Sequence, residues 1–537
     1  MIESVGISSS SLYSHQAEAV DAALDGMNVI VTTATASGKS LCFNLPVLES
    51  VLDPLGVGRD SVTPARALFL YPTKALAQDQ LRALRKLTSL WLSPSKIAVL
   101  DGDTPMKDRA SIVREASIVL TNPDMLHVTI LPGHKRHVPL LSCLRYIVLD
   151  EAHMYHGAFG MHVAMVIRRL RRICSHYRSS PQFLCCSATI ASPASLLSQL
   201  TGLPADSFHV VSEDGSPCGP KRFVLWNPPD ELEPRRVSSI GEVANLFAEL
   251  VRHGLRTIAF CTTRKLSELV LQYAQEALQA AGQQHLCETV MSYRGGYTPE
   301  QRREIEQLLF SDRLRGVAAT NALELGVDVG SMDATLHLGF QRSIASLWQQ
   351  AGRAGRRRKT SLSIYIAWDS PIDQFFLRHP QQLFSLPLEP ALLNLANPDI
   401  LQPHLLCAAS ELPLKREEDE ALFAELPAVY RDNVLQLIEK GNRKIGCLQP
   451  VLGGGGGGGE ESAMLEECNF CGAPKPSKEV SLRCIDEHRW KILVRGGRRE
   501  EEEEKDRSCR SIYEGATYMN NGKTFIIRVL DFEKREA

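Results

Sequence analysis

The sequence predicts an α/β protein with two tandem parallel-sheet lobes, followed by a C-terminal region of mixed α and β structure. Short, continuously apolar runs alternate with helical patterns, which is typical of a parallel sheet covered by helices on both faces. The alternation pauses around Glu213–Pro220 and Asn227–Arg236, where Gly, Pro and charged residues gather, and then resumes. The length of 537 residues also exceeds that of one domain. We therefore expect two lobes joined near residues 205–235.

Apolar runs mark the expected strands, and stretches such as Lys74–Leu90 mark the helices between them. One helix start is well defined, because Thr298 can cap it, Pro299 occupies its first turn and Gln301 completes a capping box. The expected strands of the first lobe are Met27–Val31, Ala65–Leu70, Ile97–Leu100, Ile118–Leu120, Tyr146–Leu149 and Phe183–Cys186. Those of the second lobe are Thr257–Phe260, Thr289–Ser292, Gly316–Ala319, Ala334–Leu338 and Ser361–Ala367.

Beyond about residue 370 the pattern changes. Leu405–Glu439 is predicted to be largely helical, and Trp490–Val494 and Thr524–Leu530 are predicted strands. The glycine run Gly453–Gly459 predicts a flexible linker, and the glutamate run Glu500–Glu504 predicts a solvated loop or exposed turn. The expected domains are lobes at 1–210 and 236–372, a linker at 211–235, a mainly helical region at 373–452, a glycine linker at 453–460 and an incomplete accessory domain at 461–537.

The composition is that of an ordinary globular protein, with 44% hydrophobic and 23% charged residues. The N-terminal segment lacks the charged start and apolar stretch of a signal peptide, and no long apolar run predicts a membrane span. Scattered cysteines, with Cys185 and Cys186 inside an apolar run, predict reduced thiols in a cytosolic or nuclear protein. With a net charge of −2, any phosphate-binding surface must be local. Composition alone leaves open an enzyme that binds no charged polymer.

A phosphate-binding loop is predicted at Thr32–Ser40, between the strand Val29–Val31 and a helix. Backbone N–H groups and a helix N-terminus would cradle the phosphates of a nucleotide there. Lys39 would add a positive charge, and Ser40 a hydroxyl for Mg²⁺. Because Thr33 replaces the usual first glycine, a chance Gly-Lys-Ser at a helix start is the alternative for this motif alone. The expected nucleotide contacts are Thr35, Ala36, Ser37, Gly38, Lys39 and Ser40.

Two carboxylates, Asp150 and Glu151, follow the apolar strand Tyr146–Leu149, at the edge where open α/β sheets bind ligands. We expect Asp150 to contact Mg²⁺ and Glu151 to polarise the attacking water. The alternative is an acidic pair that caps the next helix. That alternative fits poorly with a pair that follows a phosphate loop at the end of another buried strand.

Taken in order, these motifs resemble those of the superfamily 2 helicases, in which ATP binds between two RecA-like lobes. Asp150–His153 resembles the DEAH box, and Gln16 resembles the glutamine that reads adenine. The resemblance runs from about residue 12 to residue 357. Its other motifs are Tyr71–Leu76 (motif Ia), Thr121–Asp124 (Ib), Ser187–Thr189 (III), Phe260–Arg264 (IV), Ala319–Asp328 (V) and Gln349–Arg356 (VI).

The resemblance implies roles at the nucleotide. Arg353 and Arg356 are implied to reach the γ-phosphate as arginine fingers, and Gln349 to help to sense it. Gly326 and Asp328 are implied to contact the nucleotide from motif V.

The resemblance also implies contacts to nucleic-acid phosphates, which position a strand without reading its sequence. The implied residues are Pro72, Thr73, Lys74, Thr121, Asn122, Pro123, Thr262, Arg264, Arg294, Thr320 and Asn321. The residues implied to couple the ATP site to the strand are Ser187, Ala188, Thr189 and His153.

Within the superfamily, the chain resembles the RecQ-like Hrq helicases of fungi and plants and the bacterial MrfA-type helicases. The resemblance is carried by Met154–His162 with Arg168–Arg172, by Leu405–Leu414 and by Gly515–Thr524. Those enzymes are 3′→5′ DNA helicases that act in the repair of DNA lesions. The resemblance implies a motor that uses ATP and Mg²⁺ on single-stranded or forked DNA, in the nucleus and without a membrane partner. An RNA helicase and a non-catalytic nucleic-acid-binding module are the alternatives, and the sequence does not specify the oligomeric state.

An aromatic cluster follows the DEAH box. Tyr155, His156 and Phe159 form either a platform that stacks on bases or a packed loop, and the sequence does not decide between them.

Cys468 and Cys471 have zinc-like spacing, but no second pair of this kind follows, so we predict that the chain holds no zinc. The related family carries a four-cysteine metal module beyond the corresponding end of this chain. The sequence therefore suggests a shortened product.

Overall fold

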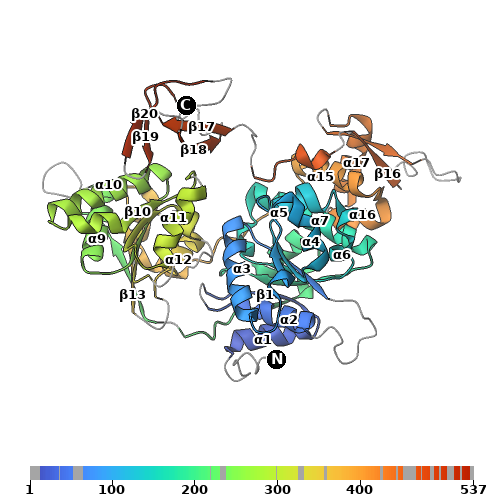
Figure 1. Cartoon of the computed structure of the whole chain (residues 1–537), viewed down its shortest axis with the longest axis horizontal. Coiled ribbons are helices and arrows are strands. Elements are labelled where there is room, and N and C mark those ends of the chain that lie inside the picture. The colour runs from blue at the N-terminus through green and yellow to red at the C-terminus, as the bar shows by residue number, and fades with distance from the viewer. Residues whose placement is uncertain are drawn as a thin grey trace. The chain divides into compact units, whose positions relative to one another are not determined.

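The chain forms two compact units (Figure 1). The first comprises Met1–Thr33, Gly38–Gly215 and Pro390–Cys484, and the second comprises Ala34–Ser37, Ser216–Glu389 and Ile485–Ala537. The computed structural model describes residues 12–34, 37–52, 65–217, 219–229, 238–297, 299–324, 332–355, 360–423, 427–442, 445–451, 467–472, 475–483, 489–494, 498–504, 513–520 and 523–531.

The first unit is built on a seven-stranded parallel sheet in the order β3-β4-β2-β5-β6-β1-β7. Alternate residues of β2 face different cores, with Ala67 and Phe69 in one and Leu68 and Leu70 in the other. The sheet is thus buried on both faces, as its continuously apolar strands predicted. The strands are β1 (Asn28–Val31), β2 (Arg66–Leu70), β3 (Ile97–Val99), β4 (Ile118–Thr121), β5 (Leu144–Leu149), β6 (Gln182–Cys186) and β7 (Phe208–Val211).

Helices cover this sheet, and all the strands expected from the sequence are confirmed; β7 is an additional edge strand. The helices are α1 (Ser14–Leu24), α2 (Ser40–Leu52), α3 (Lys74–Thr88), α4 (Met106–Glu115), α5 (Pro123–Met125), α6 (Val138–Leu141), α7 (Gly157–His176) and α8 (Pro193–Thr201).

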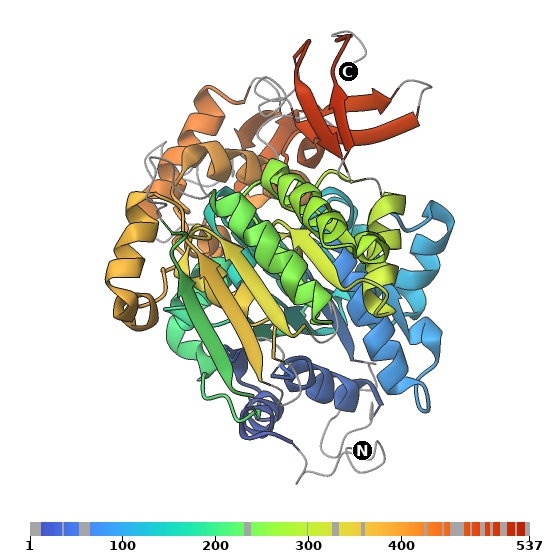
Figure 2. The ribbon, with the colours of Figure 1, turned by 90° about the vertical axis from the view of Figure 1, so that its left-hand side faces the viewer.

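The second unit holds a six-stranded parallel sheet in the order β10-β11-β9-β12-β13-β8. Two long helices, α9 and α10, lie over one face of it (Figure 2) and share a core with its strands. The strands are β8 (Lys221–Trp226), β9 (Thr257–Phe260), β10 (Val290–Tyr293), β11 (Gly316–Ala319), β12 (Ala334–Leu338) and β13 (Ser361–Ile366). The helices are α9 (Ser239–Arg252), α10 (Arg264–Ala280), α11 (Pro299–Phe310), α12 (Ile344–Ala351), α13 (Pro371–Arg378) and α14 (Pro380–Ser385).

The strands expected in the second lobe are confirmed, but β8 falls within 211–235, where the sequence suggested a linker. It pairs in parallel with β13 at the edge of the sheet and is only partly buried. An edge strand of this kind lacks the continuous apolar run by which the other strands were found. The expected cap Thr298 lies outside the described residues, and α11 begins at Pro299.

The C-terminal region is divided between the units. In the first unit, α15 (Pro398–Glu411), α16 (Arg416–Phe423) and α17 (Pro427–Glu439) accompany an antiparallel sheet in the order β14-β16-β15. In the second unit, two antiparallel hairpins pair β17 with β18 and β19 with β20. The strands are β14 (Leu414–Lys415), β15 (Gly446–Pro450), β16 (Glu467–Gly472), β17 (Arg489–Val494), β18 (Arg498–Glu504), β19 (Thr517–Asn520) and β20 (Lys523–Ile526).

The prediction of a loop at Glu500–Glu504 is wrong, because these residues belong to β18. Its antiparallel partner β17 supplies the backbone pairing that a run of glutamates, read by itself, gives no reason to expect. The predicted glycine linker Gly453–Gly459 lies outside the described residues. None of the described helices has both the length and the apolar character needed to cross a bilayer.

A buried ionic network joins α7 to the C-terminal helices of the first unit, which lie beside it in Figure 1. Arg169 of α7 donates from Nε to Glu411 Oε2 of α15 at 3.1 Å, and its terminal Nη2 donates to Oε1 of the same carboxylate. The side chains of this pair are 0% and 1% exposed. Arg172, one turn further along α7, donates to Asp419 of α16 at 2.6 Å. The arginine-rich stretch of α7 thus anchors the C-terminal helices.

Two imidazoles complete the network. The Arg169 guanidinium donates to Nδ1 of His127 at 2.8 Å and to Nδ1 of His404 at 3.2 Å. His127 donates from Nε2 to Val480 O at 2.9 Å, and His404 Nε2 lies 2.9 Å from His162 Nδ1. Burial, together with the charge of Arg169, lowers the pKa of His127 to about 3. Burial and the neighbouring His127, Arg169 and His162 also lower the pKa of His404.

We expect the network to lose stability as the pH falls below about 6.5. A histidine whose pKa is lower in the folded than in the unfolded state contributes stability that is present above the unfolded pKa and lost as the pH falls toward the folded one. At pH 5 the loss from His127 is about 2 kcal/mol. Melting temperatures measured from pH 7.5 to pH 5 should therefore fall less steeply in His127→Gln than in the natural protein.

The matched control for this prediction is His253→Gln, since His253 is exposed and pairs only locally with Glu249. It should keep the pH dependence of the natural protein. Equal pH dependence in His127→Gln and the natural protein would show that the pKa of His127 does not differ between the folded and unfolded states.

Candidate nucleotide site and strand-binding loops

The phosphate loop connects β1 to α2, as expected. Gly38 has φ of +86°, and a Cβ there would lie 2.5 Å from Nε2 of Gln16, so this position requires glycine. Lys39 donates from Nζ to Thr33 O at 2.8 Å, and α2 begins at Ser40. Ser37 is buried. The predicted nucleotide contacts Thr35 and Ala36 lie outside the described residues.

Gln16 lies against this loop. Its Nε2 donates to Gly38 O at 3.1 Å, and its Oε1 accepts from Tyr13 N at 3.1 Å in the capping box of α1. The side chain is buried. The structure therefore brings the predicted adenine-reading residue to the phosphate loop, with its amide held at both ends.

The two carboxylates lie at the carboxyl end of β5, the same edge of the sheet as the phosphate loop. Asp150 Oδ1 accepts from Glu151 N at 2.9 Å. Burial, and then the charge of Glu151, raises the pKa of Asp150 to about 7, while Lys39 acts in the opposite direction. A buried carboxylate of this kind would be stabilised in its charged form by a divalent cation, so Asp150 and the Ser40 hydroxyl fit the expected Mg²⁺ site.

Glu151 has a left-handed backbone, with φ of 51° and ψ of 46°. For a residue other than glycine this conformation costs about 1–3 kcal/mol. Such strain is characteristic of functional sites, and here it turns the chain sharply at the end of β5 into the short helix Ala152–Met154.

The DEAH box contacts motif III. Nδ1 of His153 accepts from Ala188 N at 3.2 Å and lies 3.4 Å from Ser187 Oγ. The same nitrogen lies 3.5 Å from Glu151 Oε2. Ser187 is buried, whereas Thr189 is exposed. Three of the four predicted coupling residues thus form one cluster beside Glu151.

The predicted strand-binding loops of the first unit follow the adjacent strands β2 and β4. Thr73 Oγ1 accepts from Leu76 N and caps α3, and Asn122 Oδ1 accepts from Met125 N and caps α5. Thr121 is buried and donates its hydroxyl to Leu100 O at 2.6 Å. These side chains shape the two loops. Lys74 is exposed, whereas Pro72 and Pro123 are buried.

A third turn at this edge was not identified from the sequence. Asp101 follows β3 and accepts from Asp103 N and Thr104 N, and Asp103 pairs with Lys74 Nζ at 2.8 Å. The available signal was the position of Asp101–Thr104 after an expected strand, where ligand-binding loops of a parallel sheet lie.

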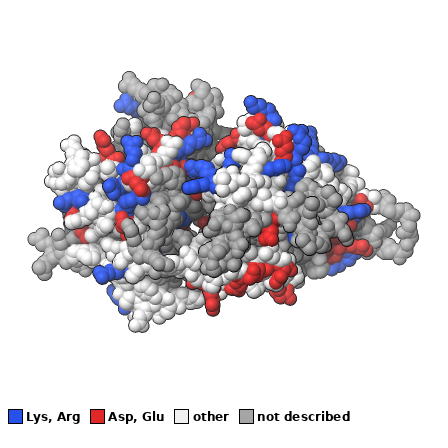
Figure 3. All heavy atoms as spheres, turned by 60° about the horizontal axis from the view of Figure 1, so that its bottom comes forward, with Lys and Arg blue, Asp and Glu red and all other residues white. Residues whose placement is uncertain are grey.

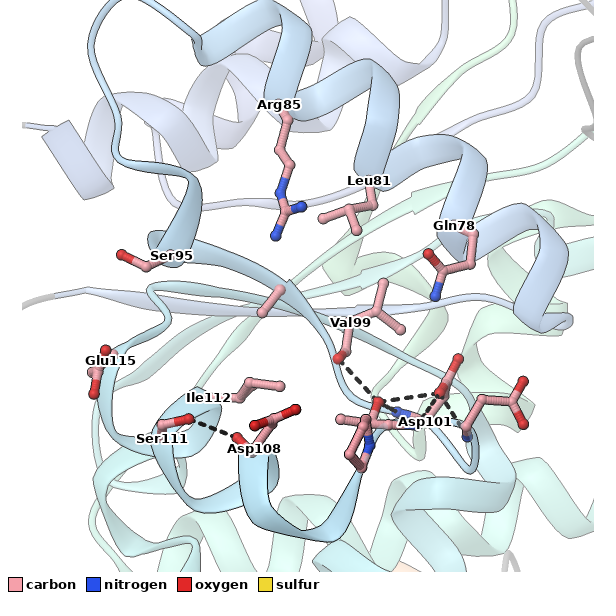
Figure 4. Close-up of a pocket in the computed structure, with 14 residues that line it drawn as sticks. Gln78, Leu81, Arg85, Ser95, Val99, Asp101, Asp108, Ser111, Ile112 and Glu115 are labelled. Atoms are coloured by element: carbon pink, nitrogen blue, oxygen red, sulfur yellow. Dashed lines mark hydrogen bonds between the residues drawn. The ribbon is translucent and has the colours of Figure 1, made fainter.

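A pocket of ≈ 420 Å³ lies beside this turn, between α3, β3 and α4 (Figure 4). Arg85 points toward it from α3 and donates to Ile97 O at 2.8 Å, and Asp101 at its far end holds the turn. The phosphate loop and the DEAH box do not line it. The pocket is therefore separate from the nucleotide residues.

In the second unit, motifs V and VI contact each other. Arg353 is 2% exposed and donates to the backbone oxygen of Glu324. Gln350 donates to Glu324 Oε2 at 3.0 Å, and Gln349 is buried. The implied nucleotide contacts Gly326, Asp328 and Arg356 lie outside the described residues. The Arg353 guanidinium thus contacts the backbone of motif V.

Four of the implied strand contacts of the second unit follow neighbouring strands, and the fifth, Arg294, is buried. Thr262 and Arg264 are partly buried at the end of β9, and Thr320 and Asn321 follow the neighbouring β11. Arg294 is buried, donates to Glu268 at 2.7 Å and lies over the ring of Tyr297, so its guanidinium is engaged within the unit.

The aromatic platform is not present as a stacking surface. Tyr155 is 0% exposed and packs against Phe159, with ring centroids 5.8 Å apart. The guanidinium of Arg483 lies 4.5 Å from the centroid of Phe159. The packing alternative is therefore confirmed for Tyr155, and only His156 is exposed in this cluster.

The cysteine pair lies in β16. Because residues three apart in a strand face opposite sides, Cys468 is buried while Cys471 is exposed opposite Cys447 of β15. This arrangement separates the two thiols of the zinc-like motif. Cys484 and Cys509 lie outside the described residues, and the absence of zinc stays a prediction.

On the face drawn in Figure 3, basic and acidic side chains are both present among uncharged ones. Together with the net charge of −2, this mixed surface favours local contacts over a global basic field as the means of holding phosphates.

The folds and motifs define a DEAD/DEAH-box helicase with two RecA-like lobes. The DEAD/DEAH box helicase family matches residues 13–197, and the helicase conserved C-terminal domain matches residues 241–358. The winged helix domain of the ATP-dependent helicase HRQ1 matches residues 393–447, which contain α15, α16 and α17.

Similar proteins cover nearly all of the chain. The ATP-dependent helicase hrq1 of Schizosaccharomyces pombe is 38% identical over 533 residues, which span 97% of this chain and 47% of that protein. The ATP-dependent helicase YprA of Bacillus subtilis is 38% identical over 532 residues, 98% of this chain and 66% of that protein. The structure of the DUF1998 helicase MrfA bound to DNA and AMPPNP has 38% identity and a TM-score of 0.86, covering 100% of this chain and 70% of that one.

The chain belongs to the HRQ1/MrfA (DUF1998) family of DEAD/DEAH-box helicases. It spans about half the length of the fission-yeast relative.

Proposed function

We propose that this chain is an ATP-driven DNA helicase motor. The observation that carries the proposal is the gathering of Lys39, Asp150 and Glu151 at one edge of the first sheet, with His153 linking them to motif III. Further support comes from the related MrfA, solved with DNA and AMPPNP.

The residues of the first unit would bind and orient the nucleotide. Lys39 would leave Thr33 O for the phosphates, Ser40 and Asp150 would hold Mg²⁺, and Gln16 would read the base from beside the loop. Bound Mg²⁺ would neutralise phosphate charge. Glu151 would accept a hydrogen bond from the attacking water and orient it.

Residues of the second unit would complete the site when the two lobes close. Arg353 would exchange its contact with Glu324 O for the γ-phosphate, joined by Arg356, and Gln349 would sense that phosphate. A change in the contacts of Glu151 would be transmitted through His153 to motif III, and from there to the strand-binding loops.

The proposed partner is single-stranded or forked DNA, held by the loops after β2, β4, β9 and β11. We further propose 3′→5′ movement, a role in DNA repair and a nuclear location, all from the family resemblance. Unwinding of partial duplexes that carry either a 3′ or a 5′ single strand distinguishes the two directions. Faster unwinding with the 5′ overhang would overturn the proposed direction.

We expect Lys39→Ala to lower DNA-stimulated ATP hydrolysis by about a hundredfold or more, since it removes the charge that meets the phosphates. Steady-state hydrolysis is measured alone, with single-stranded DNA and with single-stranded RNA. Lys107→Ala, which alters an exposed lysine of α4, is the matched control and should behave as the natural protein.

The outcomes separate the alternatives. Stimulation by DNA that is lost in Lys39→Ala supports the DNA motor. Stimulation by RNA alone would move the assignment to an RNA helicase. A folded protein that binds DNA without hydrolysing ATP would be a non-catalytic binding module.

A further inference from the structure

Arg483 lies where two predicted strand-binding loops of the first unit meet the first turn of α7. It belongs to the segment 475–483, which we call the brace and which follows the antiparallel sheet of the C-terminal region. Nε of Arg483 donates to Asp124 Oδ2 at 2.8 Å, in motif Ib. Its terminal NH2 group donates to Pro72 O at 2.5 Å, in motif Ia. Its guanidinium also covers the ring of Phe159, just after the DEAH box.

The brace is anchored independently of Arg483. Val480 and Leu482 are buried in the core shared by α7 and α15, and Val480 O accepts a hydrogen bond from His127. His127 follows motif Ib directly, in the helical turn after α5. The arginine therefore projects from a fixed backbone, while its own side chain is 40% exposed.

Resting on the proposed function, we propose that Arg483 is a positioning residue for nucleic-acid binding. It holds the loops of motifs Ia and Ib in a fixed position relative to each other, and ties both to the first turn of α7 through Phe159. A planar guanidinium suits this task, because it donates in two directions and stacks on a ring at the same time. The segment that follows the winged-helix match thereby sets the shape of the strand-binding surface of the first lobe.

A direct contact between Arg483 and a DNA phosphate is the rival explanation, and charge distinguishes the two. If Arg483 positions the loops, Asp124→Asn weakens DNA binding as Arg483→Ala does, because either change breaks the same pair. If Arg483 binds phosphate directly, removal of the Asp124 charge strengthens binding. A direct phosphate contact would also give Arg483→Ala a smaller salt dependence of binding, by about one unit of slope.

The test uses the full chain and two readouts. Fluorescence anisotropy with labelled single-stranded DNA should show about tenfold weaker binding for Arg483→Ala, equivalent to about 1.4 kcal/mol. Arg483→Lys, which keeps the charge but not the planar fork, should recover part of this loss. Lys478→Ala removes an exposed charge from the same brace and should change affinity less than twofold.

Hydrogen exchange is the second readout and does not depend on activity. Arg483→Ala should speed amide exchange in residues 72–77 and 121–126, and leave α2 unchanged. Unchanged exchange in both loops would overturn the positioning role, as would stronger DNA binding by Asp124→Asn. If Arg483→Ala exchanged faster in both loops but the natural protein bound no DNA, the brace would be upheld and the proposed function rejected.

Discussion

Glu151→Gln is expected to reduce DNA-stimulated ATP hydrolysis by about a thousandfold, because an amide cannot accept the water proton in the way that a carboxylate does. The substitution keeps the size of the side chain, so the left-handed backbone at this position and the cluster with His153 should persist. Steady-state hydrolysis at saturating DNA measures the loss, and binding of a fluorescent ATP analogue should stay within about threefold.

Glu115→Gln is the control for this prediction, since Glu115 is an exposed carboxylate at the end of α4 that pairs with Arg114. It should leave hydrolysis unchanged. If Glu151→Gln kept hydrolysis within tenfold of the natural protein, the general base would have to be another group, and the assignment of the DEAH box would need revision.

Arg169→Ala is expected to destabilise the first unit by about 3–5 kcal/mol, because it leaves the Glu411 carboxylate buried without its partner. The same change removes the donor to His127 and His404. Thermal and urea unfolding should show the loss as an earlier transition of the first unit. Hydrogen exchange should locate it at α7 and α15.

Two further variants test whether the unpaired buried charge, and not the loss of side-chain atoms alone, destabilises Arg169→Ala. Arg252→Ala breaks an exposed pair with Glu249 and should cost less than about 1 kcal/mol. The double change Arg169→Met with Glu411→Leu removes both charges and should regain much of the stability lost in Arg169→Ala. A double variant no more stable than Arg169→Ala would contradict the view that an unpaired buried charge is the cause.

Local pattern determined the two sheets and the nucleotide motifs. A buried parallel strand needs a continuous apolar run, and a phosphate loop or a catalytic carboxylate must follow such a strand directly. The roles of Lys39 and Asp150 could therefore be predicted from their immediate neighbours in the sequence. The sequence gives no sign of the edge strand β8, because this strand is only partly buried. The glutamate run of β18 predicts a loop, because the run itself does not reveal its partner strand.

The sequence by itself determined the fold class, the order of the motifs and the residue types at the nucleotide site. Only the tertiary structure decided that Tyr155 is packed, that Arg294 is paired with Glu268, and that the C-terminal helices anchor to α7. Arg169 and Glu411 lie 242 positions apart, and Arg483 and Asp124 lie 359 apart. No periodicity links residues at such separations, because their partners are chosen by the packing of whole elements rather than by neighbouring residues.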